Sequence, residues 1–172
     1  MKKSLLFLYL LSFMLCIQCL LSACDKEKAA PVRQGMIPPD PGALYLANDQ
    51  PVKFNKYLGK PLVVLFFSNS CCTDELEKLE TLVASSKQEE LQVLGINVGD
   101  SLKEVERLGQ EKRLSFPLAY DPILASKHRL RLMAIPTILI IGQDGKILGR
   151  IIGKISTDQL HNKILTKIKG GQ

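Results

Sequence analysis

The chain of 172 residues has no tryptophan, only two histidines and few other aromatic residues. Because aromatic residues make up only 6% of it, the core must be built from leucine, isoleucine and valine. The net charge of +6 is small and dispersed, which argues against a nucleic-acid-binding protein. Internal repeats and low-complexity segments are also lacking. Once a leader is set aside, the length suits one domain with one core.

The N-terminus has the pattern of an export signal. Two lysines precede an apolar run over residues 5–21, which ends in small residues. This run is long enough that an uncleaved membrane helix has to be considered as well. We favour a signal peptide over residues 1–23, because the sequence Leu-Ser-Ala-Cys at 21–24 resembles the bacterial lipobox. The resemblance implies that Cys24 is lipidated with more than one acyl chain, such as a diacylglycerol and a palmitate, since one chain holds only weakly.

A lipobox implies a bacterial membrane lipoprotein on the extracytoplasmic, periplasmic face. Asp25 after the cysteine resembles the inner-membrane retention signal of enteric-type bacteria. Residues 24–42 are charged and then proline-rich, which is typical of a flexible tether, and the domain is expected over residues 43–172. Two further cysteines lie in the leader, so only Cys71 and Cys72 remain for chemistry.

The domain alternates between strand and helix patterns. Residues 61–67 form a continuous apolar run, which is typical of a strand buried on both faces. The other expected strands are 43–46 and 52–54 as a hairpin, 91–98, and 137–141 and 146–152 around a tight turn. The expected helices are 71–86, 102–113, 124–132 and 157–168. This order predicts an α/β fold with a central mixed β-sheet flanked by helices.

Four segments together resemble the thioredoxin-fold proteins, and more narrowly the membrane-tethered thiol–disulfide oxidoreductases of the TlpA and ResA type. They are residues 50–61, 65–71, 134–137 and 141–147. The resemblance covers residues 43–169 and implies a thioredoxin-like fold with an N-terminal β-hairpin extension. It also implies that Pro136 is the cis-proline of the family and that Ile135 and Pro136 contact the substrate chain.

The redox motif departs from the family pattern of Cys-x-x-Cys followed by a glutamate three residues later. Residues 71–77 read Cys-Cys-Thr-Asp-Glu-Leu-Glu, a degenerate motif. Cys71 matches the attacking cysteine and Glu77 matches the glutamate near the dithiol, where a buried carboxylate would accept protons. Asp74 occupies the position of the resolving cysteine, and Ser70 replaces the usual tryptophan.

The loss of the resolving cysteine limits the chemistry. A helix N-terminus favours the thiolate that attacks a disulfide, whereas the nearby Asp74 carboxylate disfavours it. Cys72 is the only internal partner for Cys71, but adjacent side chains in a regular helix diverge by about 100°. A vicinal disulfide would require the first helical turn to unwind. We therefore expect a monothiol or an externally resolved cycle.

The expected function is a thiol–disulfide oxidoreductase that acts on exported proteins, with Cys71 as nucleophile, Cys72 as accessory thiol and a membrane thiol reductant as possible electron donor. Neither a cofactor nor a metal is expected, although adjacent thiols suit Cu(I). One alternative is a redox-silent binding module that keeps the peptide groove. Another is a peroxiredoxin-like thiol peroxidase, because residues 72–75 match its Cys-x-x-Glu pattern, although Asn69 stands at the position of its hydroxyl.

Overall fold

The computed structural model describes residues 32–86 and 91–171. They form one six-stranded sheet with the strand order β1-β4-β3-β2-β5-β6. The central pairs β2–β3 and β3–β4 are parallel, whereas β2–β5, β5–β6 and β1–β4 are antiparallel. The sheet is therefore mixed, as the sequence predicted. The strands are β1 (Tyr45–Leu46), β2 (Leu62–Phe67), β3 (Gln92–Val98), β4 (Leu118–Asp121), β5 (Thr137–Ile141) and β6 (Ile147–Ile152).

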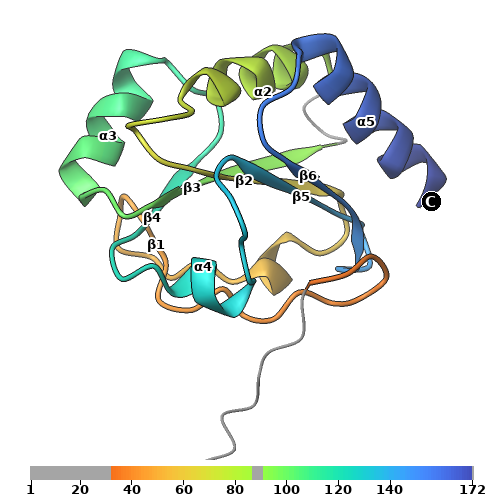
Figure 1. Cartoon of the computed structure of the whole chain (residues 1–172), viewed down its shortest axis with the longest axis horizontal. Helices are drawn as coiled ribbons and strands as arrows, with labels where there is room; N and C mark the ends of the chain where they lie inside the picture. Colours follow the sequence, from red (N-terminus) through yellow and green to blue (C-terminus); the bar gives the residue numbers. More distant parts are fainter. Residues whose placement is uncertain (1–31, 87–90, 172) are drawn as a thin grey trace, which may run out of the picture.

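Helical segments cover both faces of this sheet (Figure 1). They are η1 (Phe54–Tyr57, a 3-10 helix), α2 (Asp74–Ser85), α3 (Leu102–Glu111), α4 (Ala125–Arg129) and α5 (Thr157–Gly170). Helices α2, α3 and α5 lie on one side, and α4 and η1 lie on the other. Within the described residues, no helix combines the length and apolarity that a membrane span requires.

Strand β2 is the centre of the core, because all six of its side chains are buried. Alternate residues point to opposite faces, so β2 contributes to two apolar clusters. Phe66 belongs to the cluster closed by the N-terminal segment and the residues around α4. Phe67 belongs to the cluster closed by α2 and α5. This arrangement explains the continuous apolar run in the sequence, since each face of the strand is covered.

The domain begins earlier than the sequence suggested. Residues 32–42 were expected to belong to the tether, but Val32 is buried in the core. The Gly35 amide donates to the Ile147 carbonyl, and the Ile147 amide donates to the Met36 carbonyl, both at 2.8 Å. This proline-rich segment therefore packs on the domain. The expected signal peptide, Cys24 and the start of the expected tether lie outside the described residues.

The N-terminal hairpin is smaller than expected. It consists of two-residue β1 and one isolated bridge between Tyr45 and Pro51, flanked by hydrogen bonds from the Leu46 amide to the Gln50 carbonyl and from the Val52 amide to the Leu44 carbonyl, both at 2.9 Å. Residues 54–57 form η1 where the sequence had suggested the end of a strand. Strand β1 pairs instead with β4, a strand of only four residues that the sequence pattern did not reveal.

Candidate active site

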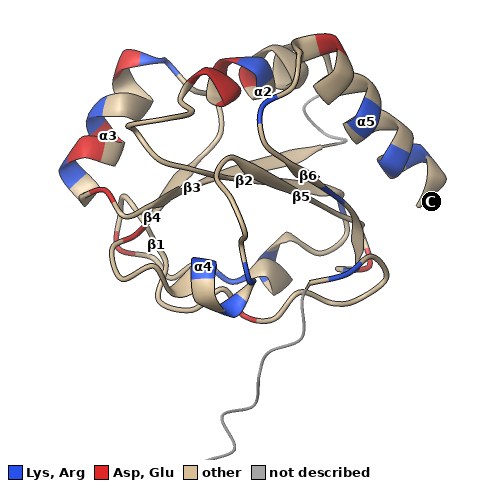
Figure 2. Cartoon of the chain, in the orientation of Figure 1, with Lys and Arg blue, Asp and Glu red and all other residues tan. Residues whose placement is uncertain are grey.

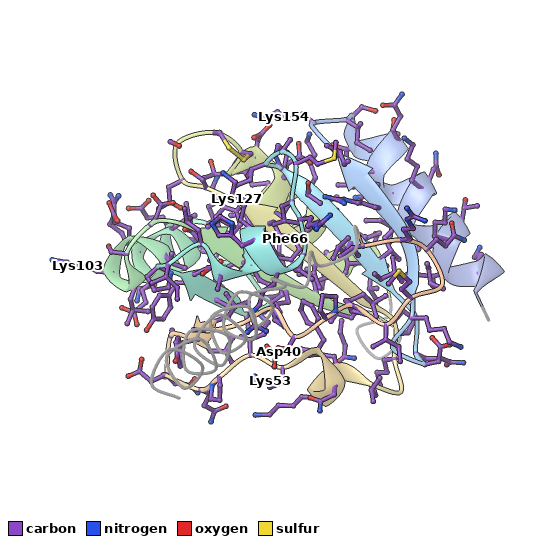
Figure 3. The ribbon with its side chains drawn as sticks, turned by 60° about the horizontal axis from the view of Figure 1, so that its bottom comes forward. Asp40, Lys53, Phe66, Lys103, Lys127 and Lys154 are labelled. Atoms are coloured by element: carbon purple, nitrogen blue, oxygen red, sulfur yellow. A yellow bond between two sulfur atoms is a disulfide. The ribbon has the colours of Figure 1, made fainter. Side chains whose placement is uncertain are left out.

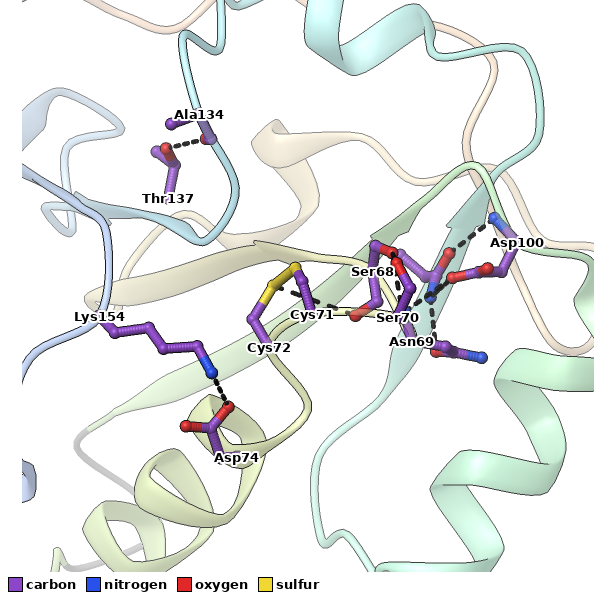
Figure 4. Close-up of a disulfide and its surroundings, with 11 residues drawn as sticks. Ser68, Asn69, Ser70, Cys71, Cys72, Asp74, Asp100, Ala134, Thr137 and Lys154 are labelled. Carbon is purple, nitrogen blue, oxygen red and sulfur yellow. Dashed lines mark hydrogen bonds and ion pairs between the residues drawn. A yellow bond between two sulfur atoms is a disulfide. The ribbon is translucent and has the colours of Figure 1, made fainter.

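The two cysteines lie before helix α2, in the turn that follows β2 (Figure 4). The expectation of a helix from residue 71 is wrong, because α2 begins at Asp74. Outside the regular helix the two side chains are not forced apart, and Cys71 and Cys72 form a vicinal disulfide. The expectation that they would not pair is therefore corrected. Cys71 is exposed, whereas Cys72 is only 1% exposed.

Backbone hydrogen bonds fold this turn onto the start of α2. The Ser68 carbonyl accepts from the amides of Cys71, at 3.3 Å, and Cys72, at 3.4 Å. The Glu75 amide then donates to the Cys72 carbonyl at 3.2 Å, which leads the chain into the helix. Both sulfur atoms consequently lie near the N-terminus of α2, where the helix dipole favours a negative charge.

A buried asparagine attaches the same turn to strand β3. The Asn97 side chain is fully buried, and its Nδ2 donates to Asn69 Oδ1 and to Asp100 Oδ2, each at 2.8 Å. Asp100 Oδ2 also accepts from the Asn69 amide at 2.8 Å, and Asn97 Oδ1 accepts from the Asp100 amide at 3.0 Å. This closed network holds the residues just before Cys71 (Figure 4). Sequence reasoning missed it, because nothing in the local pattern joins residues so far apart.

The loop with Pro136 lies beside the cysteine turn. The bond between Ile135 and Pro136 is cis, which confirms that expectation. Thr137 pairs with Phe66 in the antiparallel β2–β5 register, so the loop before Thr137 lies next to the chain that leaves β2. Thr137 Oγ1 donates to the Ala134 carbonyl at 2.6 Å and braces the loop (Figure 4). Pro136 is buried and Ile135 half-buried. The structure thus brings Cys71, Cys72, Ile135 and Pro136 to one end of the sheet.

Glu77 does not point to the cysteines. Its side chain is 64% exposed and pairs with Lys112. The buried carboxylate is Glu75, only 1% exposed, which accepts from Lys78 Nζ at 2.7 Å. The same Lys78 Nζ donates to the Ile155 carbonyl at 2.6 Å. Glu75 follows Cys72 by three residues, so the Cys-x-x-Glu spacing was the signal in the sequence for this carboxylate.

Asp74 has a cationic partner that the sequence did not reveal. Its Oδ1 lies 2.8 Å from the Nζ of Lys154, in the loop before α5 (Figure 4). This hydrogen bond lowers the pKa of the Asp74 carboxyl below its ordinary value. Asp74 therefore stays ionised at neutral pH, and Lys154 partly compensates the negative charge that it adds near the cysteines.

No group of three or more metal-ligating side chains occurs among residues 32–86 and 91–171. His161 is used in helix packing, since its Nε2 lies 2.9 Å from the Lys78 carbonyl oxygen. The side chains that the structure brings together at this site are the two cysteines and their charged neighbours.

Two curated relatives are thiol–disulfide oxidoreductases named ResA. The protein of Geobacillus kaustophilus is 22% identical over 114 residues, which are 65% of this chain and 66% of the relative. The protein of Halalkalibacterium halodurans is 23% identical over 120 residues, which are 69% and 68%. The match spans about two thirds of the length of each relative. It confirms the resemblance to the ResA type that the sequence segments indicated.

Solved structures show the same fold. A protein of Chlorobium tepidum described as the thiol:disulfide interchange protein DsbE has a TM-score of 0.71 at 21% identity, covering 79% of this chain and 98% of that one. StoA from Bacillus subtilis has a TM-score of 0.57 at 19% identity, covering 70% and 95%. These likenesses confirm the thioredoxin-like fold.

The family comparison covers the site and most of the sheet. The model of the AhpC/TSA family matches residues 40–150, from the segment before β1 into β6, and so includes both cysteines and the cis-proline loop. This chain belongs to the AhpC/TSA family.

Proposed function

We propose that this protein is a thiol–disulfide oxidoreductase in which Cys71 and Cys72 form one two-electron couple. The observation that carries the proposal is the pairing of an exposed Cys71 with a buried Cys72 at the start of α2, beside the cis-proline loop. The names of the curated relatives support this chemistry. The couple replaces the missing Cys-x-x-Cys pair, because Cys72 takes the resolving role that Asp74 is unable to perform.

In the oxidising direction, a substrate thiolate attacks the exposed sulfur of Cys71. The bond between the two sulfur atoms breaks, Cys72 leaves as a thiolate, and a mixed disulfide forms on Cys71. The second substrate thiolate then attacks the substrate sulfur of that mixed disulfide and releases Cys71. The substrate has lost two electrons and two protons, which the two cysteines have gained as thiols. The reverse sequence reduces a substrate disulfide.

The cis-proline loop forms the substrate-contact surface of this proposal. Met133, 81% exposed, and Ala134, also exposed, precede Ile135 and Pro136 beside the cysteine turn. An extended, partly apolar segment of a substrate protein fits such a surface. We assign no step to Glu77, since its carboxylate faces solvent and pairs with Lys112.

The proposed substrates are thiols or disulfides of exported proteins. The lipobox supports this, because lipidation of Cys24 would hold the domain on the extracytoplasmic face of the bacterial membrane. In the reducing direction the vicinal pair ends as the disulfide, and a membrane thiol reductant that reduces it would complete the cycle.

The test is to trap mixed disulfides with single cysteine variants of the full chain, expressed in a bacterial membrane. With Cys72→Ser, a substrate disulfide captured by Cys71 has no internal thiol to release it, so adducts should accumulate and disappear on reduction. With Cys71→Ser, the remaining Cys72 is buried and adducts should be scarce. The matched pair therefore assigns the nucleophile.

Three results would contradict the proposal. Adducts through neither cysteine would exclude thiol exchange. A stable complex without a sulfur bond would favour the redox-silent binding module. Rapid consumption of hydrogen peroxide that requires Cys72 would favour the thiol peroxidase, for which Cys72 and Glu75 provide the Cys-x-x-Glu spacing.

A further inference from the structure

Apolar side chains gather at the end of the domain opposite the cysteines. Ile37 is 69% exposed, Leu58 is 55% exposed and Met36 is 40% exposed. Ile37 and Leu58 line a groove of about 340 Å³, whose other walls include Phe54 and Ile141. Met36, Ile37 and Leu58 are called here the basal patch. Large apolar side chains grouped around a groove mark an interaction surface, whereas single ones do not.

The register of the sheet fixes the distance of this patch from the redox site. Ile141, in the groove, pairs with Leu62 at the start of β2, whereas Cys71 follows the end of the same strand. A six-residue strand is about 17 Å long, so the patch and the disulfide occupy opposite ends of the central strand. Figure 3 shows Asp40 and Lys53, which line the groove, at one end of the molecule and Lys154 at the other.

The charges near the basal patch are predominantly positive. Arg33, Lys56 and Lys60 lie on the same segments, are exposed, and form no ion pair with another described residue. The two acidic residues in the groove, Asp40 and Asp144, are each paired with a lysine. An apolar surface with basic residues around it is complementary to a membrane that contains anionic lipids.

The position at which the described chain begins points to the same occupant. The described chain begins at Val32, four residues before Met36, and Cys24 lies only eight residues before Val32. Eight residues span at most about 29 Å even when fully extended. If the acyl chains of Cys24 are inserted in a bilayer, the end of the domain that carries the basal patch has to remain close to the lipid headgroups.

We infer that the basal patch rests on the surface of an anionic phospholipid membrane, so that the Cys71–Cys72 couple faces away from the lipid. The inference rests on the lipid anchor of the proposed function, but it is independent of the thiol chemistry. It explains why apolar and basic residues collect where the chain enters the domain. A domain that a long tether held away from the membrane would need neither the apolar nor the basic residues at this end.

The absence of tryptophan makes a direct test possible. We would introduce Ile37→Trp, or as a matched control Ile123→Trp, into the full chain. Ile123 is 67% exposed and follows β4, whose end lies with those of its parallel neighbours at the redox side. Each protein is purified from membranes and reconstituted into vesicles of phosphatidylglycerol and phosphatidylcholine. Acrylamide quenches tryptophan from water, and brominated phospholipid quenches it from the bilayer.

The expected result is severalfold weaker acrylamide quenching for Ile37→Trp than for Ile123→Trp, together with quenching by brominated lipid for Ile37→Trp alone. Adding Lys56→Glu and Lys60→Glu should reverse this protection. Equal acrylamide quenching at both positions in vesicle-bound protein would overturn the inference. It would favour a protein partner as the occupant of the basal patch. Loss of the chain from the vesicles would overturn it too. In that case the mass of the N-terminal peptide shows whether the lipid on Cys24 is missing, and the trapping assay reports separately on the thiol chemistry.

Discussion

Asn97 donates a hydrogen bond of 2.8 Å to Asn69, and this contact attaches the cysteine turn to the end of β3. Asn97 is fully buried, and each polar atom of its side chain takes part in the network with Asp100. A satisfied buried network of this kind specifies one arrangement of the chain. The position of Cys71 therefore depends on a residue of a neighbouring strand as well as on its own turn.

Asn97→Ala should lower the free energy of unfolding by about 1–3 kcal/mol, because it leaves Asn69 Oδ1 and the Asp100 amide without their partners. Urea denaturation measures this change. Asn162→Ala, on the exposed surface of α5, serves as the control and should change stability by less than about 0.5 kcal/mol. The same loss in both variants would show that the network has no special role.

The two neighbouring glutamates should differ strongly in their effect on stability. Glu75→Ala leaves Lys78, only 18% exposed, without its carboxylate, and should cost about 3 kcal/mol. Glu77→Ala removes an exposed partner of Lys112 and should cost about 0–1 kcal/mol. Thermal and urea unfolding of the two variants provide the comparison. Similar costs would contradict the burial difference between these side chains.

The pair of Asp74 and Lys154 should make stability depend on pH. Lys154 lowers the pKa of Asp74 in the folded state, so the stabilisation is present above the unfolded value of 3.8 and is lost as the pH falls through the lower folded pKa. Both side chains are 49% exposed, so the contribution is only about 0.2–1 kcal/mol.

Comparing wild type with Lys154→Gln in urea at neutral pH and near pH 2 would measure it. The variant should be less stable at neutral pH, and the difference should shrink on acidification. A difference that is the same at both pH values would exclude the ion pair as its cause.

Asp74→Asn should make the reduced site more reactive at neutral pH. It removes a carboxylate near the start of α2 and so favours the thiolate of Cys71. The rate of iodoacetamide labelling of the reduced protein should rise. Asp158→Asn, at the start of α5, is the control for a general change in charge and should leave the rate unchanged. A slower reaction of Asp74→Asn would mean that the pair with Lys154 positions the turn and that its charge matters less.

Much of the fold was predictable because its signals are local. The buried run that became β2, the strands β5 and β6, and the cis-proline loop follow from apolar runs, turn residues and resemblance over short segments. The short strand β4 was not predicted, because four residues show too little periodicity to indicate a strand. The packing of residues 32–42 on the domain was not predicted, because prolines are typical of a tether and also of an irregular segment that packs on a domain.

The candidate site was harder to predict, since its decisive contacts are between distant residues. Lys154 meets Asp74 across 80 positions of sequence, and Lys112 meets Glu77 across 35. The start of α2 was placed three residues too early, and this error alone made a vicinal disulfide look unfavourable. Helix ends depend on capping contacts that local propensity specifies poorly.

The central claim is that Cys71 and Cys72 form one couple, and counting reactive thiols in the oxidised protein tests it most directly. The full chain is oxidised with diamide, alkylated under denaturing conditions and digested. The mass of the peptide that carries both cysteines is then measured by mass spectrometry. The account predicts no label and a mass lower by two hydrogens, then two labels after reduction by dithiothreitol. Two thiols that stay free would contradict it and favour the redox-silent binding module, whereas separate adducts or disulfide-linked dimers through Cys71 would contradict it and restore the monothiol cycle.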